Sequence, residues 1–407
     1  MSWETRRIGD VAKVEHGFAF KSQFFSDSPT KYHLVTPGNF ILGGGFNTTK
    51  CKYYEGPFVD GHVLQAGDLI VTMTDLSRNT DALGGPALVP QSKCGEVFLH
   101  NQRIGKLLIN KEEINPRFLY YSMCLESTRS QVVATATGTT VKHTSPKRIE
   151  AVEIECPRLD TQGRIAEVLG AFDDKIAANQ RVLQISNELL RVNYLDLMEG
   201  PLTNFSDIAV EIREKAEPQQ VDEQTVQVSL EHFESKSIWL ERWGTARDVE
   251  STKSQFQKGD LLFGKLRPYF HKVSVAVTDG ICSTDVLVIR AKDPSNQMLV
   301  SLAGNSDSVV DRAVMNSNGT RMPRAKWTDI ADCVVPDPSA PKVQIFCEGS
   351  LTVFHRAQAA IAENQTLART RDELLPLLMN GKITVAEAKD EVEALGVDKH
   401  AEGAGDV

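Results

Sequence analysis

The sequence repeats several short motifs at a nearly constant interval. The segment IAANQ at 176–180 returns as IAENQ at 361–365, which is 185 residues later. The segment ELL at 188–190 returns at 373–375 with the same offset. Repetition over such a distance predicts a duplicated architecture, because each copy specifies the same local structure. We therefore expect a globule and a helix, followed by a second globule and a second helix.

Two further pairs of motifs extend the repeat into the globular segments. GDLI begins at Gly67 and GDLL at Gly259, and the GT pair at Gly138 returns at Gly319. The offsets of these two pairs are 192 and 181 residues, so the interval varies along the chain. Surface loops tolerate insertions and deletions, which cause variation of this kind. The sequence thus predicts two related globules whose loops differ in length.

Two segments have the periodicity of long helices that pack along one face. Their apolar residues alternate steps of three and four, and each segment has an asparagine at the same step. Two such seams in one chain can pair, and a helix of about 36 residues would be roughly 54 Å long. Gly170, Gly349 and Pro376 are expected to weaken the helices locally. The predicted seam positions are Ile165, Leu169, Phe172, Ile176, Asn179, Leu183 and Leu190 in the first helix, and Phe354, Ile361, Asn364 and Leu375 in the second.

The fold class predicted from these features is α+β. Short runs of β-branched and aliphatic residues bounded by Gly, Asp and Asn indicate that the globules are β-rich. Two β-rich globules would be separated by two long antiparallel helices that form a coiled coil, in a pseudo-two-fold tandem repeat. The predicted divisions are 1–157 and 201–338 for the globules, 158–200 and 339–382 for the helices, and 383–407 for a short helix and a disordered tail.

Composition excludes several classes of protein. The 407 residues are 41% hydrophobic, and no apolar run approaches the roughly 20 residues that a membrane span needs. The first residues lack the apolar core of a secretory signal, so we expect a cytoplasmic protein without membrane contact. The 7 cysteines are scattered and form no Cys-x-x-Cys pair, which favours free buried thiols over disulfides or a zinc site.

Catalytic motifs are missing from the sequence. No Gly-x-x-x-x-Gly-Lys-Ser/Thr segment is present to cradle a nucleotide. RPYF at 267–270 lacks the leading polar residue and the second proline of an amino-methyltransferase loop, and LGGGF at 42–46 precedes no convincing helix. Glu387 and Lys389 have the spacing of a metal nuclease but fall in a predicted tail helix. We expect no catalytic residues, no metal site and no cofactor in this chain.

The segment GDLLFGKLRPYFHK at 259–272 concentrates cations among aromatic residues, although the whole chain has a net charge of -9. A strand that ends in a polar turn would explain it, and so would a contact to a nucleic-acid backbone, since phosphates select local clusters of cations. The acidic total charge also suits a basic partner protein. An alternative function is therefore a coiled-coil scaffold whose globules bind protein without DNA specificity.

Taken together, GDLLFGKLRPY in one globule and IAANQ with ELL in the helices resemble the specificity subunit of Type I restriction-modification enzymes. The opening WETRRIGDVAKVEHGFAFKS is also similar to that family, and the resemblance covers residues 3–382. The first copy departs from the pattern, because GDLIVTMTDLSRN has no basic and aromatic strip.

The resemblance implies a subunit without enzymatic activity of its own. Each globule would be a target recognition domain that reads a few base pairs of double-stranded DNA, so that the recognised site is asymmetric and divided by an unread spacer. The helices would dock two methyltransferase subunits, which bring S-adenosylmethionine. Motor-nuclease subunits, with ATP and magnesium, would add restriction.

DNA contacts are expected from loop residues with amide, guanidinium, ammonium and hydroxyl groups, because these groups bind base edges and phosphates. A glycine in the loop TGTTVKH would let the backbone approach a phosphate. The predicted contacts in the first globule are Lys21, Ser22, Thr72, Thr74, Ser77, Arg78, Asn79, Asn101, Arg103, Thr139, Thr140, Lys142 and His143. Those in the second globule are Lys265, Arg267, Tyr269, His271, Lys272, Ser283, Thr284, Thr320, Arg321 and Arg324.

Overall fold

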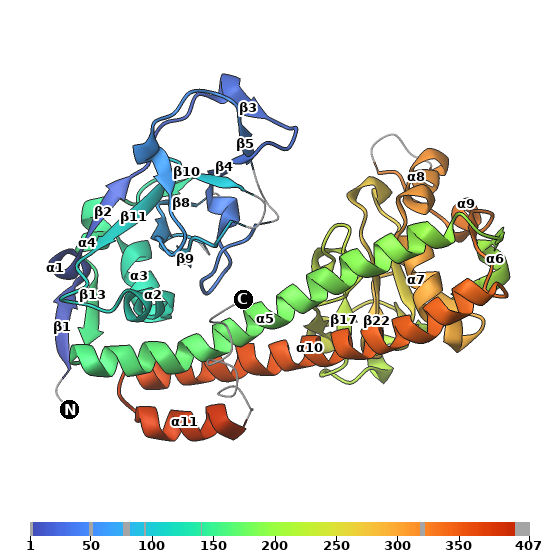
Figure 1. The fold of residues 1–407 in the computed structure, drawn as a ribbon. Helices are drawn as coiled ribbons and strands as arrows, with labels where there is room; N and C mark the ends of the chain where they lie inside the picture. Colours follow the sequence, from blue (N-terminus) through green and yellow to red (C-terminus); the bar gives the residue numbers. More distant parts are fainter. Residues whose placement is uncertain are drawn as a thin grey trace. The chain divides into compact units, whose positions relative to one another are not determined.

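The chain forms two compact units in the computed structural model. Unit 1 comprises the residues up to Asp174 and those from Leu367 onward, and unit 2 comprises Lys175–Thr366. Two helices of 39 residues, α5 (Leu159–Leu197) and α10 (Pro341–Met379), each contribute to both units (Figure 1). The structure describes residues 3–48, 52–75, 82–92, 95–139, 141–317 and 322–394.

Unit 1 contains two main sheets and several short helices. Its four-stranded antiparallel sheet has the order β2 (Ala12–His16), β11 (Ile104–Ile109), β7 (Leu69–Thr72), β9 (Pro86–Leu88). Its five-stranded sheet has the order β3 (Phe25–Ser26), β5 (Lys52–Tyr54), β4 (Tyr32–Val35), β10 (Val97–His100), β6 (Val63–Leu64). Two short pairs join β1 (Glu4–Arg7) to β13 (Glu153–Cys156), and β8 (Thr74–Asp75) to β12 (Lys142–His143). The helices are α1 (Ile8–Val11), α2 (Pro116–Cys124), α3 (Glu126–Ala134), α4 (Pro146–Glu150) and, near the C-terminus, α11 (Val385–Ala394).

Unit 2 has the same plan. Its four-stranded antiparallel sheet has the order β15 (Ala209–Ile212), β23 (Val286–Ala291), β20 (Leu261–Gly264), β21 (Val273–Val275). Its five-stranded sheet has the order β16 (Lys215–Ala216), β19 (Lys253–Phe256), β22 (Gly280–Cys282), β17 (Val226–Val228), β18 (Gly244–Thr245). A further pair joins β14 (Leu202–Asn204) to β24 (Val334–Pro336). The helices are α6 (Phe205–Ile208), α7 (Gln297–Asn305), α8 (Asp307–Asn316) and α9 (Trp327–Ile330).

The parallel strand pairs confirm the duplication. Most strand pairs are antiparallel, but β10 runs parallel to β4 in unit 1, and β22 runs parallel to β17 in unit 2. In both units this parallel pair lies in the five-stranded sheet, and the four-stranded sheets have corresponding orders. The predicted fold class, with two β-rich globules and two long helices, is therefore confirmed.

The repeated GDL motif forms the same turn in both units. Gly67 and Gly259 have φ angles of 84° and 91°, in the left-handed region that glycine adopts without strain. In each unit the glycine N–H donates to a carbonyl of the neighbouring strand, and the aspartate carbonyl accepts from the same residue. The distances are 2.9 Å from Gly67 N to Val89 O, 3.0 Å from Val89 N to Asp68 O, 2.8 Å from Gly259 N to Ala276 O, and 2.9 Å from Ala276 N to Asp260 O.

The aspartate side chain of the motif also has the same role in both units. The carboxylates of Asp68 and Asp260 each accept a hydrogen bond of 2.7 Å from the backbone N–H three residues earlier. Asp68 then pairs with Lys106 at 2.6 Å, whereas Asp260 accepts two bonds from Arg290, at 2.7 and 2.8 Å. These hydrogen bonds raise the pKa of Arg290. The basic partner lies on β11 or β23, so the motif ties its turn to the adjacent strand.

An antiparallel strand pair closes the base of each globule. Glu4 of β1 lies opposite Cys156 of β13 in unit 1, and Leu202 of β14 lies opposite Pro336 of β24 in unit 2. The N–H of Asp337 also donates to the carbonyl of Pro201 at 2.9 Å. The second globule therefore enters and leaves the helices at adjacent points.

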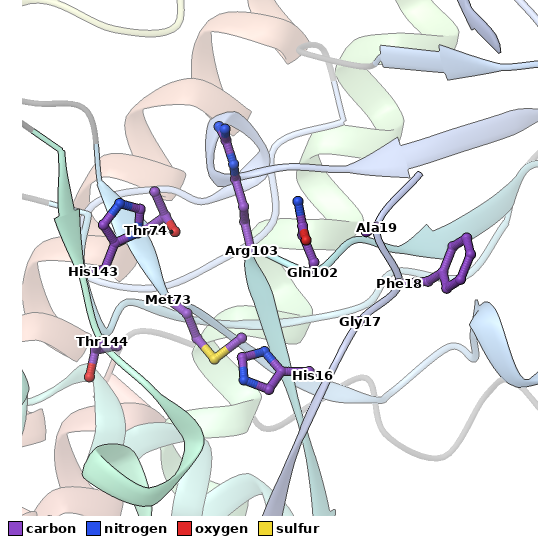
Figure 2. Close-up of a pocket in the computed structure, with 10 residues that line it drawn as sticks. All are labelled: His16, Gly17, Phe18, Ala19, Met73, Thr74, Gln102, Arg103, His143 and Thr144. Carbon is purple, nitrogen blue, oxygen red and sulfur yellow. Dashed lines mark hydrogen bonds between the residues drawn. The ribbon is translucent and has the colours of Figure 1, made fainter. Parts of the chain in front are cut away.

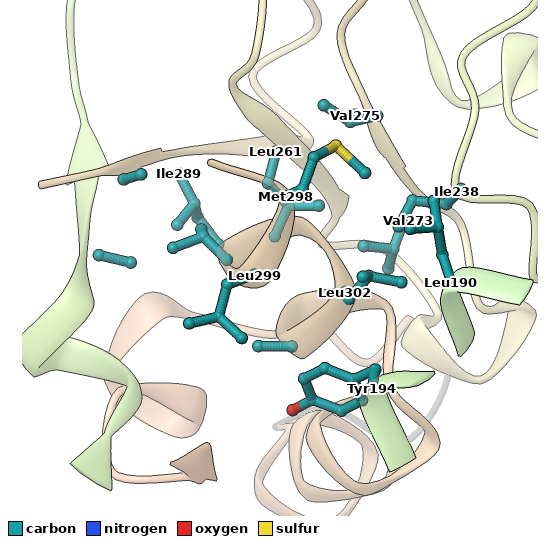
Figure 3. Close-up of a cluster of buried hydrophobic side chains, with 14 of the residues drawn as sticks. Leu190, Tyr194, Ile238, Leu261, Val273, Val275, Ile289, Met298, Leu299 and Leu302 are labelled. Atoms are coloured by element: carbon teal, nitrogen blue, oxygen red, sulfur yellow. The ribbon is translucent and has the colours of Figure 1, made fainter. Parts of the chain in front are cut away.

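The core of unit 2 is shared between α5 and the globule. Tyr194 of α5 packs among residues of α7 and of the four-stranded sheet, including Leu302 and Val273 (Figure 3). The indole Nε1 of the fully buried Trp239 donates to the carbonyl of Leu183 at 3.1 Å. Burial of large apolar side chains stabilises this packing by about 2 kcal/mol each. The C-terminal part of α5 is thus an integral part of unit 2.

The two long helices pair in the predicted antiparallel direction. Within unit 2, Asn179 lies 2.9 Å from Asn364, and Asp196 pairs with Lys342 at 2.6 Å. Most predicted seam positions are buried, but Ile176 and Asn364 are half-buried. Near the end of α10 the buried positions are taken by Leu374 and Leu378, whereas Leu375 is half-buried, so the seam is displaced from its predicted position there. The buried seam positions are Ile165, Leu169, Phe172, Asn179, Leu183, Leu190, Phe354 and Ile361.

Gly170 lies where α2 approaches α5. A Cβ at this position would lie 2.6 Å from the guanidinium of Arg117, whose Nη2 donates to the carbonyl of Gly170 at 3.1 Å. Arg117 also forms an ion pair with Asp174. The glycine gives α2 room to attach to α5 within unit 1. Pro376 lies inside α10, and the helix continues to Met379.

A first prediction concerns the asparagine pair of the seam. Asn179 is 3% exposed, and its amide donates to Asn364 and to Glu363. Replacing Asn179 with Ala leaves the half-buried Asn364 carbonyl without this donor and is expected to destabilise unit 2 by about 1 kcal/mol in urea unfolding. The double variant Asn179→Leu with Asn364→Leu removes both partners and is expected to recover most of that loss. Equal losses in the two variants would contradict this account.

Candidate nucleic-acid interface

A surface hollow in unit 1 lies at one end of the four-stranded sheet. Its volume is about 540 Å³. It gathers the end of β2, the turn before β11, and the residues around β8 and β12 (Figure 2). The lining residues are His16, Gly17, Phe18, Ala19, Met73, Thr74, Gln102, Arg103, His143 and Thr144.

The GFAFKS turn forms one wall of this hollow. A Cβ on Gly17 would lie 2.2 Å from the carbonyl oxygen of Asn101, so the close approach of the two chains requires glycine. Phe18 N donates to the carbonyl of His100 at 2.7 Å. The Phe18 ring is 43% exposed and stacks on His62 with the ring centroids 4.1 Å apart. The predicted contacts Lys21 and Ser22 are the last two residues of this segment, and both are exposed.

The loop TGTTVKH forms the opposite wall as a closed turn. Thr137 and His143 exchange two backbone hydrogen bonds, of 2.9 and 2.8 Å. Gly138 has a φ of 102°, and a Cβ there would lie 2.0 Å from the carbonyl oxygen of Val141, so the turn needs glycine. Thr139 is exposed at its tip, and Lys142 is half-buried. The turn presents backbone and hydroxyl groups to solvent, as a phosphate contact requires.

The two threonines that follow GDLI and were predicted to contact DNA are buried. Thr72 is fully buried and its hydroxyl donates to the carbonyl of Ala82, so it holds a turn and does not face solvent. Thr74 is 3% exposed, and its Oγ1 lies 3.1 Å from Nδ1 of His143. The exposed His143 ring is thereby oriented by a buried hydroxyl.

Arg103 is the exposed cation of the hollow, and it lies in the turn between β10 and β11. The side chain of Asn101 accepts a hydrogen bond from Arg103 N at 3.1 Å and therefore shapes the turn. Gln102 and His16 are exposed beside it. The sequence analysis missed these two residues, although an amide next to a predicted arginine is a signal for base-edge contacts.

In unit 2 the loop between β20 and β21 lies at the corresponding end of the sheet. It contains a single 3₁₀ turn, η7 (Pro268–Phe270). The N–H of Arg267 donates to the carbonyl of Pro323 at 2.8 Å, and the N–H of Lys265 donates to the carbonyl of Asp285 at 2.8 Å. Three segments distant in sequence therefore meet here, around residues 265–271, 283–285 and 323–325.

The residues on either side of η7 have left-handed backbones. Arg267 has a φ of 51° and His271 a φ of 49°, and neither is glycine. Each such residue costs about 1 kcal/mol and persists only where surrounding contacts hold it. Strained backbone of this kind is concentrated at functional sites. The Arg267 side chain and both rings of the turn, Tyr269 and Phe270, are exposed.

Two predicted contacts of this loop face the interior. His271 is 4% exposed, and its Nε2 lies 2.8 Å from the carbonyl of Asn305, which only accepts, so Nε2 is protonated. Burial lowers the pKa of His271. Lys272 donates from Nζ to the carbonyl of Leu230 at 2.6 Å. Both residues anchor the loop, because the buried His271 ring and the half-buried Lys272 ammonium form hydrogen bonds inside the protein.

The remaining contacts predicted in unit 2 surround the loop. Lys265 is half-buried and its Nζ donates to the carbonyl of Thr284 at 2.7 Å, while the side chain of Thr284 is exposed. Arg324 is 57% exposed and pairs with Asp285 at 3.1 Å. Ser283 is half-buried and its hydroxyl accepts from the N–H of Asp285. Six predicted contacts lie outside the described residues: Ser77, Arg78, Asn79, Thr140, Thr320 and Arg321.

No metal or membrane element is found in the parts of the chain that the structure describes. Among these residues, no three His, Cys, Asp or Glu side chains are grouped to hold a metal ion. Within the same ranges, no helix combines the length and apolar character needed to cross a bilayer. The cysteines described are free thiols, at Cys124, Cys156, Cys282, Cys333 and Cys347.

Comparison with known proteins places the chain beside one family. Residues 1–189 match the family model described as Type I restriction modification DNA specificity domain. The Type I restriction enzyme EcoBI specificity subunit of Escherichia coli is 28% identical over 206 residues, which are 50% of this chain and 40% of that protein. The MjaIX specificity subunit of Methanocaldococcus jannaschii is 22% identical over 327 residues, which are 69% of this chain and 72% of that protein.

The fold has a solved counterpart. The crystal structure of a Type-I restriction-modification system S subunit from M. genitalium aligns with a TM-score of 0.57 at 14% identity. The alignment covers 93% of this chain and 96% of that one. At this level of identity the match establishes the arrangement of the elements alone.

Proposed function

We propose that the chain is a specificity subunit of the Type I restriction-modification family and that it recognises an asymmetric, bipartite DNA site. Its globules, 1–157 and 201–338, act as the two target recognition domains. It has no catalytic role of its own and docks methyltransferase subunits, to which motor-nuclease subunits are added for restriction. S-adenosylmethionine, ATP and magnesium are bound by those partners, in the cytoplasm.

One observation carries this proposal. In both units the exposed cations predicted to contact DNA lie at the same end of the repeated four-stranded sheet. Arg103 precedes β11 next to the end of β7, and Arg267 follows the end of β20 next to the start of β23. Two equivalent surfaces with different side chains suit a protein that reads two different sequences.

Methylation mapping tests the proposal directly. The chain is expressed with a Type I methyltransferase subunit from the same source genome, in a host without its own adenine methylation, and the host genome is sequenced for modified bases. A site of two short specific sequences divided by a fixed unread spacer is expected. Modification without such a site, or absence of modification by an active methyltransferase, would refute it. Binding of a basic protein by the globules, with no DNA binding, would favour the scaffold alternative.

The salt dependence of DNA binding gives a second prediction. If Arg103 and Arg267 contact phosphates, replacing either with Gln reduces the slope of log K against log salt by about one and weakens binding to all sequences alike. If either reads a base, the loss is confined to the cognate half-site, at about 1–3 kcal/mol. The matched control is Arg213→Gln, because Arg213 is exposed and pairs locally with Glu211. An Arg213 effect as large as the other two would contradict the assignment.

A further inference from the structure

The tip of the loop between β20 and β21 exposes two aromatic rings side by side. Tyr269 is 53% exposed and Phe270 is 46% exposed. Their ring centroids are 4.8 Å apart, and the ring planes are inclined by 54°. Water therefore covers about half of a continuous aromatic surface. The free energy gained by burying such a surface is available to a binding partner.

The loop holds these rings outward. η7 is closed by hydrogen bonds from Phe270 N to Arg267 O at 2.9 Å and from His271 N to Pro268 O at 2.8 Å. The buried His271 ring fixes the end of the turn on Asn305. His271 also lies 3.5 Å from Asp307, which is one of the groups facing it. Because the left-handed residues at both ends are held by these contacts, the rings are preorganised and do not fold back onto the sheet.

Two arginines accompany the rings, and one of them, Arg324, is paired with Asp285 at 3.1 Å. Arg267 directly precedes the turn and is exposed, and Arg324 is 57% exposed on the adjoining segment. The backbones of these residues meet in an isolated bridge between Leu266 and Arg324. Aromatic rings flanked by guanidinium groups suit a ligand that combines flat apolar faces with phosphates, which is the chemistry of a base step in duplex DNA.

We propose that Tyr269 and Phe270 form a wedge that enters between two base pairs and kinks the half-site read by unit 2. The proposal rests on the DNA recognition proposed above and adds a means of reading the duplex, because easily unstacked steps are kinked at lower cost. The corresponding segment of unit 1, residues 73–85, contains no aromatic residue. This loop therefore supplies a wedge in unit 2 and has no aromatic counterpart in the same loop of unit 1.

Fluorescence of 2-aminopurine locates the wedge. Duplexes carrying the mapped site receive 2-aminopurine at one position at a time, in either half, and are bound by the full-length chain with its methyltransferase subunit. The fluorescence is expected to rise severalfold at one step of the half read by unit 2. Energy transfer between dyes at the duplex ends is expected to increase on binding, because a kink shortens their separation.

Variants tie this signal to the two rings. Tyr269→Ala with Phe270→Ala is expected to return the fluorescence to the level of free duplex and to weaken binding about tenfold. Phe270→Trp keeps an aromatic ring at the tip of the loop and should retain both the fluorescence rise and the wild-type affinity. Val210→Ala is the matched control, because Val210 is apolar and 42% exposed in the same unit but lies on β15. Circular dichroism of each variant checks that it folds.

Several outcomes would overturn the wedge while leaving DNA recognition intact. One is a fluorescence rise that persists in the double Ala variant. Another is the absence of a rise at every step of a duplex that the complex binds specifically. A third is a rise confined to the half-site read by unit 1. Loss of methyltransferase binding with an unchanged DNA signal would assign the rings to a protein contact. If the wild-type complex binds no specific duplex, the proposed function itself fails.

Discussion

If the proposed function holds, replacing residues 201–337 with the second globule of a Type I specificity subunit will change one half of the methylated sequence and leave the other half unchanged. The reason is structural, because β14 pairs with β24 and the N–H of Asp337 donates to the carbonyl of Pro201. An exchange at these points cuts the chain where its two ends are adjacent. The contacts of residues 3–156 with their own helical segments are not altered.

The exchange is measured by methylation mapping of the hybrid expressed with the original methyltransferase subunit. The matched control exchanges residues 3–156, which are bounded by the pair of β1 and β13, and it should change the opposite half. The specificity changes completely in one half, which is a larger effect than any point variant is expected to give. If a folded and active hybrid still methylates both original half-sites, the assignment of the globules as target recognition domains is wrong.

The largest effect of a single substitution on stability is expected at Asp260. Its side chain is 2% exposed and accepts two hydrogen bonds from Arg290, which is 28% exposed. Asp260→Asn leaves the guanidinium without its counter-charge, at a cost of about 3 kcal/mol, toward the low end for a buried pair because Arg290 reaches water. The urea midpoint of unit 2 will fall accordingly.

Tryptophan fluorescence follows this transition, because Trp239, Trp243 and Trp327 lie in unit 2 and only Trp3 lies in unit 1. The matched variant is Asp68→Asn, in which the equivalent partner is Lys106. That pair has side-chain exposures of 18% and 22%, and a single lysine contact gives a smaller loss, of about 1 kcal/mol. Equal losses of unfolding free energy in the two variants would show that the two hydrogen bonds of Arg290 stabilise the fold no more than the single Lys106 contact does.

The sequence predicted those features that depend on local pattern. The GDL motif at Gly67 and Gly259 forms a turn that requires a left-handed residue, so its repetition could be recognised from the sequence. The apolar steps of three and four around Asn179 indicate a partner helix, and this pairing could be recognised in the same way. The duplication and the antiparallel helices followed from the repeated motifs and the seams, and the sheet-rich globules followed from short runs of β-branched and aliphatic residues.

The candidate interface was less predictable, because the exposure of a polar side chain depends on distant segments. Thr72, His271 and Lys272 are polar residues at strand ends, and in the sequence they resemble loop donors. In the fold they meet carbonyls of Ala82, Asn305 and Leu230, which are 10, 34 and 42 residues away. Side-chain composition alone does not reveal such partners. Arg103 and Arg267 differ because their turns direct them to solvent.

The division of α5 and α10 between the units has a consequence for synthesis on the ribosome. Unit 2 is a continuous stretch, Lys175–Thr366, whereas unit 1 requires the segment that starts at Leu367. The portion translated first is thus the last to acquire its full set of partners. Until the end of α10 has been synthesised, Asp173 on α5 lacks its partner Arg371. The nascent protein therefore passes through a stage in which all residues of unit 2 are present and unit 1 is still incomplete.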